Sequence, residues 1–127
     1  MTNARHGKHK LAKQTGTTAH FAQVTVRVEP STLDKFTASP PADSIRGWEA
    51  SALAGAKAAI HELRERGHIK DPRFVDITNF VGTPTDTSHA DASWATFMAV
   101  FAAFPEVRPP VLEFSASEDS WVLSWRS

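Results

Sequence analysis

Four polar residues in the middle of the chain come closest to a catalytic pattern. They are Asp76, His89, Asp91 and Ser93, and an acid, a histidine and a serine are the residue types of a nucleophilic triad. A working triad needs a base that the acid orients and an oxyanion hole beside the nucleophile. A serine shortly after a capping aspartate is more typical of the first turn of a helix. We therefore expect no catalytic site, and the chain is expected not to be an enzyme.

Two short spacings are similar to pairs of metal ligands, namely His6-x-x-His9 and His89-x-Asp91. A zinc site needs three or four converging ligands, each oriented by hydrogen bonds from its surroundings. The chain has no cysteine, which excludes disulfides, thiol nucleophiles and thiolate metal sites. We therefore expect neither a metal site nor a cofactor.

The start of the chain is basic, although the formal net charge of the whole chain is zero. The basic residues before the first acid, Glu29, are Arg5, Lys8, Lys10, Lys13 and Arg27. A basic segment is compatible with nucleic-acid contact. The alternative is a solvated tail. We expect residues 1–12 to be a basic, mobile segment, in which a short strand could begin near Lys8.

Length and composition indicate one globular domain, which we place at residues 13–127. The chain has 127 residues, of which 41% are apolar and 22% charged, as is ordinary for a single soluble domain. No apolar run reaches about 18 residues, so no transmembrane helix is expected. The basic start has no apolar segment behind it, unlike a secretory signal. The expected location is the cytoplasm, without membrane contact.

Hydrophobic periodicity predicts the elements that position these residues. Apolar and polar residues alternate strictly at 22–28, which predicts a strand with one buried face. A turn at 15–18 precedes it. Further strands are predicted at 35–38 and 74–81, and helices at 44–66 and 92–104 with apolar residues three or four apart.

The end of the chain contains two apolar segments, 111–114 and 121–125, which a turn at Glu118-Asp119 could join as a hairpin. Trp121 and Trp125 share one strand face, since Leu123 lies between them at the strand period of two. Core packing or an oligomer interface is the expected role of this face. Helices mixed with a largely antiparallel sheet predict a two-layer α+β sandwich.

Three segments follow one another in an order and at a spacing similar to a known family. They read KQTGTTAHFAQVTVRVEP at 13–30, AIHELRERG at 59–67 and DASWATF at 91–97. The first resembles the opening strand of domain IV of elongation factor G, the translocation GTPase. The second resembles the end of a helix in that domain with its closing glycine, and the third resembles the head of its last helix. The resemblance extends over about residues 8–112.

The resemblance implies a specific layout, with a left-handed β-α-β unit, four to five strands, and two helices on one face. The hand is taken from the family, because about 98% of parallel crossovers are right-handed. This chain departs from the family in its glycine-rich turn, which is reduced to Gly16, and in Trp94, which stands where the family has a glutamate. The chain has no GxxxxGK[ST] segment, so GTP binding is not expected.

In that family two tip loops reach into the decoding region of the ribosome, and the matching positions here are 13–18 and 86–89. Their side chains supply a cation, amide and hydroxyl donors and an imidazole, which suit phosphate and 2′-hydroxyl groups. The candidate RNA-binding residues are Lys8, Lys10, Lys13, Gln14, Thr15, Gly16, Thr17, Thr18, His20, Thr85, Asp86, Ser88 and His89. The alternative is that both segments are ordinary surface turns whose polar groups bond to nearby backbone.

These observations lead to three functional hypotheses. The first is a non-catalytic, translation-related module that binds the ribosome, ribosomal RNA or another structured RNA through the two loops and the basic start. The second is a protein-interaction or assembly module that keeps the fold without binding RNA, and that forms a homo-oligomer through the strand of Trp121 and Trp125. The third is an enzyme with a site around His89, which would require a deep pocket at that residue.

Overall fold

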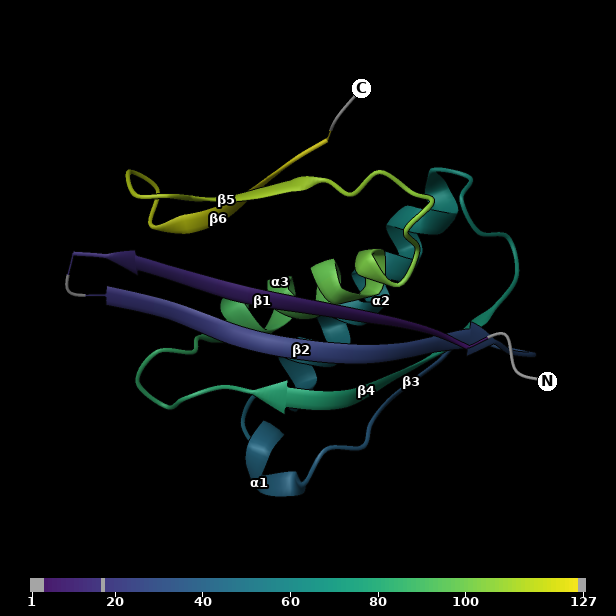
Figure 1. Cartoon of the computed structure of the whole chain (residues 1–127), viewed down its shortest axis with the longest axis horizontal. Coiled ribbons are helices and arrows are strands. Elements are labelled where there is room, and N and C mark those ends of the chain that lie inside the picture. Colours follow the sequence, from purple (N-terminus) through teal and green to yellow (C-terminus); the bar gives the residue numbers. More distant parts are fainter. Residues whose placement is uncertain (1–3, 17, 126–127) are drawn as a thin grey trace.

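The structure, a computed structural model, describes residues 4–16 and 18–125 (Figure 1). Its centre is a four-stranded sheet in the order β1-β2-β4-β3. The strands are β1 (Arg5–Thr15), β2 (Thr18–Pro30), β3 (Lys35–Ala38) and β4 (Arg73–Val81). β1 and β4 both run antiparallel to β2, whereas β3 runs parallel to β4. The strand predicted at 22–28 is confirmed, and it is longer than the alternation that predicts it.

The two faces of this sheet differ in burial because β2 alternates. Val24, Val26 and Val28 are fully buried on the face that we call the inner face. Thr25 and Arg27, which lie between them, are only half-buried on the opposite, outer face. The helices α2 and α3 lie on the inner side, and β1 and β2 pass in front of them in Figure 1. The sheet therefore has one side in the core and one side that these two helices leave open.

Among the described residues there are three helices where two were predicted: α1 (Ala42–Ile45), α2 (Glu49–Glu65) and α3 (His89–Ala102). The predicted continuous helix at 44–66 is wrong at its start, because the chain turns between α1 and α2. Gly47 has a φ of 87° there, a left-handed conformation that glycine adopts at little cost. The predicted stop at Gly67 agrees with the structure, in which Gly67 has a φ of 79°.

A second, separate sheet follows the helices and consists of β5 (Val111–Ser115) and β6 (Ser120–Ser124). They form the predicted antiparallel hairpin, with Asp119 at a φ of 51° in its turn. Residues 4–16 and 18–125 therefore form an α+β fold with six strands in two sheets and three helices. This confirms the α+β class, but the fold has more elements than the four to five strands and two helices expected.

The tryptophans at the end of the chain point toward their own molecule. The ring of Trp125 lies 5.7 Å from that of Phe101, measured between centroids, and Trp121 donates a hydrogen bond from Nε1 to Asp91 at 2.8 Å. Val122, on the opposite side of β6, is 38% exposed. The two tryptophans thus attach the hairpin to α3 within one chain.

Two glycines allow unusually close approach between elements. A Cβ on Gly7 of β1 would lie 1.9 Å from the backbone oxygen of Ala99, and a Cβ on Gly55 of α2 would lie 2.1 Å from that of Ser93. Both partners belong to α3. α3 is therefore packed directly on backbone at two sides, which matches its nearly continuous burial.

Much of the basic N-terminal segment belongs to the sheet. Residues 5–12, which were expected to be mobile, form part of β1, and residues 1–3 lie outside the described residues.

Within the part of the chain that the structure describes, no helix is long and apolar enough to cross a membrane.

Candidate functional site

The two segments that were predicted to act together meet at one end of the molecule. The backbone amide of Phe21, in β2, donates to the backbone oxygen of Asp86 at 2.9 Å. The hydroxyl of Thr87 donates to the backbone oxygen of Phe21. The turn of the β1–β2 hairpin and the loop after β4 are thereby joined at the start of β2. We call this end the tip, and it comprises residues 13–16, 18–20 and 82–89.

Hydrogen bonds within the loop at 82–88 fix its shape. The backbone amide of Thr83 donates to the Thr87 hydroxyl at 2.8 Å, and the amide of Asp86 donates to the Thr83 hydroxyl at 3.1 Å. The indole Nε1 of Trp48 donates to the backbone oxygen of Thr87 at 3.2 Å. Thr87 is buried, so its hydroxyl serves the fold, as the alternative interpretation of a backbone-bonded turn expects.

A buried carboxylate lies directly beneath the tip. Asp91 is fully buried and accepts hydrogen bonds from Nδ1 of His20 at 3.1 Å and from Nε1 of Trp121 at 2.8 Å. It also accepts from the backbone amide of Ser88, whose hydroxyl in turn accepts from the amide of Asp91. Ser88 is thus the N-cap of α3, and Asp91 is the third residue of a capping box.

His20 differs from the other candidates in its burial. Its side chain is only 13% exposed, and its ring lies 4.4 Å from that of Phe114, between centroids. Its Nε2 atom is buried and has no hydrogen-bond partner among the described residues. His20 therefore supports the tip from within rather than facing solvent.

The remaining tip candidates lie at the surface or are half-buried. Those exposed are Lys13, Gln14, Gly16, Thr18, Thr85, Ser88 and His89, and those half-buried are Thr15 and Asp86. Two of them shape the hairpin turn, since the side-chain amide of Gln14 donates to the Gly16 oxygen at 2.9 Å and the Thr15 hydroxyl donates to the Thr18 oxygen at 3.3 Å. Thr17 lies outside the described residues.

Lys8 and Lys10 do not belong to the tip. They lie further along β1, opposite Thr25 and Gln23 of β2, and both are exposed on the outer face of the sheet. Lys8, Lys10 and Lys13 were grouped as one basic segment in the sequence, whereas the structure divides them between the sheet and the tip.

The structure does not bring together the four residues with triad chemistry. His89 is exposed, and its Nδ1 lies 3.0 Å from the hydroxyl of Ser51. Asp91 is occupied by His20, Ser88 and Trp121, as described above. Asp76 accepts instead from the hydroxyls of Thr37 and Ser39, each at 2.8 Å. None of these groups orients His89 as a base toward Ser93.

The predicted metal-like spacings do not converge either. In β1, His6 lies opposite Arg27 and His9 lies opposite Val24, so the two histidines are on opposite faces of the sheet. Burial on the inner face lowers the pKa of His9 below its ordinary value. Among the described residues no group of three or more His, Asp or Glu side chains could hold a metal ion.

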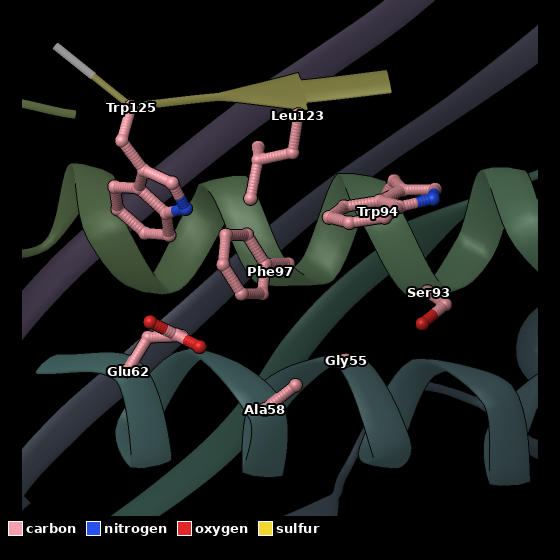
Figure 2. Close-up of a pocket in the computed structure, with 8 residues that line it drawn as sticks. All are labelled: Gly55, Ala58, Glu62, Ser93, Trp94, Phe97, Leu123 and Trp125. Atoms are coloured by element: carbon pink, nitrogen blue, oxygen red, sulfur yellow. The ribbon is translucent and has the colours of Figure 1, made fainter. Parts of the chain in front are cut away.

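A pocket that the sequence did not predict lies between α2, α3 and the end of β6. Its volume is about 280 Å³, and Figure 2 shows its walls, with Trp94, Phe97 and Trp125 along one side and Glu62 opposite. Trp125 is already covered by Arg66, whose guanidinium carbon lies 3.4 Å from the ring centroid. Arg66 also pairs with Glu62 at 3.3 Å. None of the residues that line this pocket belongs to the tip.

Comparison with known proteins shows similarity in fold. No family model matches the chain, and no curated protein matches its sequence. Among solved structures the chain is similar to the crystal structure of ttk003000868 from Thermus thermophilus, with a TM-score of 0.72 and 22% sequence identity. The match covers 87% of this chain and 17% of that chain. The chain therefore corresponds in fold to a small part of a much longer protein.

Proposed function

We propose that the protein is a non-catalytic RNA-binding module, related to domain IV of elongation factor G, that binds the ribosome or another structured RNA through the tip. The observation that carries this proposal is the meeting of the two loops. The bonds of Phe21 to Asp86 and Thr87 hold the hairpin turn beside the loop after β4. Two loops on one end can contact a single RNA structure together.

The chemistry of the exposed tip suits this role. Lys13 and His89 supply a cation and an imidazole, while Gln14, Thr18 and Thr85 supply neutral donors. Such groups position a protein on phosphate and sugar oxygens without reading sequence. Their exposed position means that RNA can reach them without rearrangement of the fold.

The proposed kinship also includes the hand of the crossover. β3 and β4 are adjacent and parallel, and the chain between them forms α1 and α2. We propose that this connection is left-handed, as the resemblance to elongation factor G implies. Support for the kinship comes from the order of the elements, while the similar Thermus thermophilus structure supports the fold alone.

The test is co-sedimentation of the purified protein with ribosomes across a series of salt concentrations. The double variant Lys13→Gln/His89→Ala should weaken binding about tenfold at low salt and reduce the salt dependence, because fewer counterions are released. The control is Lys70→Gln, an equal charge change at an exposed residue just before β4, beyond the opposite end of the sheet from the tip. The proposal fails if the wild type does not sediment with ribosomes at low salt, or if the tip variant and the control behave alike.

A further inference from the structure

We infer that the outer face of the four-stranded sheet binds single-stranded RNA, with Phe21 as a stacking platform and Lys8, Lys10 and Arg27 as phosphate contacts. The inference rests on the proposed RNA binding and deepens it. It states that the RNA bound at the tip continues as a single strand across the outer face of the sheet. It adds a surface that the tip residues do not include.

The pairing of the strands places these residues beside one another. Across β1 and β2, Lys8 lies opposite Thr25 and Lys10 lies opposite Gln23. Cross-strand partners point to the same side of a sheet, with Cβ atoms about 5 Å apart. The row continues into β4, where Asn79 lies opposite Thr25. Lys8 and Lys10 therefore line the β1 side of the outer face, beside neutral hydrogen-bonding groups of β2 and β4.

The cations of this face are free for an anionic partner. Among the described residues, no carboxylate lies within ion-pair distance of Lys8, Lys10 or Arg27. Asp76, the cross-strand neighbour of Arg27, directs its two oxygens to the hydroxyls of Thr37 and Ser39. The arginines of the α2 end differ, since both Arg64 and Arg66 are paired with acids.

Two phenylalanines lie at opposite ends of the same face. Phe21 is on β2 next to the tip, and Phe74 is on β4 opposite Glu29. Both are half-buried. Each has a lysine beside its ring: Lys10 Nζ lies 6.0 Å from the Phe21 centroid, and Lys35 Nζ lies 5.5 Å from the Phe74 centroid.

This combination suits a base stacked on a ring whose phosphate is bound by the adjacent ammonium group. Stacking on aromatic side chains together with a cationic surface is how proteins hold single strands without reading their sequence. Some RNA-binding domains use a four-stranded sheet in the same way. Helices cover one face of that sheet, and bases stack on aromatic side chains of the other face. The length of β2 from Phe21 to Glu29 is roughly 26 Å at the usual rise per residue, which is long enough for several nucleotides.

Phe21 connects this surface to the tip. Its backbone amide and oxygen are held by Asp86 and Thr87, while Lys10 lies near its ring. An RNA bound at the tip would therefore pass directly onto the ring of Phe21. The polar residues between the two phenylalanines, Gln23, Thr25 and Arg27, favour RNA over an apolar protein surface or a lipid bilayer.

The test is fluorescence anisotropy of the full chain with a labelled oligouridine of about twelve nucleotides, which has no structure for the tip to recognise. Phe21→Leu should weaken binding about tenfold or more through loss of stacking. Its matched control is Phe36→Leu, because Phe36 lies opposite the buried Val75 on the inner side of the same sheet. Circular dichroism is the check that both variants keep the fold.

A second pair of variants tests the cations. Lys8→Gln/Lys10→Gln should lower the slope of log affinity against log salt by about 1.4, the value for two phosphates of a single strand. Lys57→Gln/Lys70→Gln, which removes the same charge from α2 and the segment before β4, should leave the slope unchanged. Oligodeoxyuridine of equal length is the comparison for the ribose.

The outcomes separate this inference from the proposed function. Oligouridine binding that survives Lys13→Gln/His89→Ala but is lost with Phe21→Leu supports the sheet face. The inference is overturned if oligouridine does not bind at low salt, or if Phe21→Leu and Phe36→Leu bind equally. It is also overturned if heparin, which has no bases, binds as tightly as the RNA. Tip-dependent sedimentation with ribosomes would remain intact in all three cases.

Discussion

Nδ1 of His20 lies 3.1 Å from a carboxylate oxygen of Asp91, a residue 71 positions further along the chain. The same carboxylate accepts from Nε1 of Trp121 and from the backbone amide of Ser88. One buried acid therefore joins β2, the start of α3 and β6. A buried carboxylate is costly unless hydrogen bonds satisfy it. The need to keep the hydrogen bonds of Asp91 therefore holds all three elements in place.

We predict that Asp91→Ala destabilises the protein by about 3 kcal/mol or more, because it leaves three donors without their acceptor and removes half of the capping box. Asp91→Asn keeps the shape and should cost less, about 1–2 kcal/mol. The measurement is the free energy of unfolding in urea. Glu118→Ala, at the exposed turn between β5 and β6, is the control. A loss for Asp91→Ala below about 0.5 kcal/mol, the range of ordinary surface substitutions, would contradict the prediction.

The contact between α2 and α3 gives a prediction in which two effects have opposite signs. Helix propensity alone would make Gly55→Ala stabilising by about 1 kcal/mol. The new Cβ, however, would lie 2.1 Å from the backbone oxygen of Ser93, which cannot move without shifting α3. We therefore expect a loss of about 2 kcal/mol or more.

Thermal and urea unfolding of Gly55→Ala measure this sign directly. Ala54→Gly, at the exposed neighbouring position of α2, calibrates the propensity effect and should lose about 1 kcal/mol. A Gly55→Ala protein that is more stable than the wild type would show that the two helices are not packed backbone to backbone.

The burial of His9 should make the stability of the protein depend on pH. Burial lowers the pKa of His9 in the folded protein, whereas the unfolded chain has a value of about 6.5. Between these two values the unfolded state binds the proton and the folded state does not. The free energy of unfolding should therefore fall as the pH decreases from about 7 toward the folded pKa, and this loss should stop below it.

Urea unfolding at a series of pH values tests this dependence. His9→Gln should flatten the decline that begins below about pH 7, because the titrating group is removed. His6→Gln, on the exposed outer face of the same strand, should retain the slope of the wild type. Equal slopes for the two variants would mean that His9 is not buried in solution.

A second titration concerns the loop between β2 and β3. The Arg64 guanidinium donates two hydrogen bonds to Asp34, each at 2.9 Å, and lowers the pKa of that carboxyl. The resulting stabilisation is present above the unfolded value of about 4 and is lost as the pH falls through the lower folded pKa. Because each side chain is 36% exposed, we expect an effect below about 1 kcal/mol.

The comparison of wild type with Asp34→Asn at about pH 7 and below about pH 4 measures this contribution. The variant should be less stable than the wild type at neutral pH and nearly equal to it in acid. The control is Asp71→Asn, in the exposed segment before β4. A difference between Asp34→Asn and the wild type that persists unchanged in acid would contradict the assignment.

Several elements could be predicted from the sequence because residues close along the chain dictate their structure. The alternation at 22–28 determined β2 and its two faces, and the turn residues around Gly67 and Glu118-Asp119 determined where α2 ends and where the last hairpin turns. The break at Gly47 is the exception. The apolar spacing continues through it, and only its left-handed φ of 87° reveals the turn.

Which distant residues lie together could not be predicted from the sequence, because it depends on how the elements pack. The pairing of His20 with Asp91 and the joining of Phe21 to Asp86 depend on how β2, β4 and α3 are placed, and no local pattern carries that information. The same holds for the separation of Lys8 and Lys10 from the tip, which follows from strand register. Local periodicity reports what each segment buries, whereas proximity between distant segments follows from packing of the whole chain.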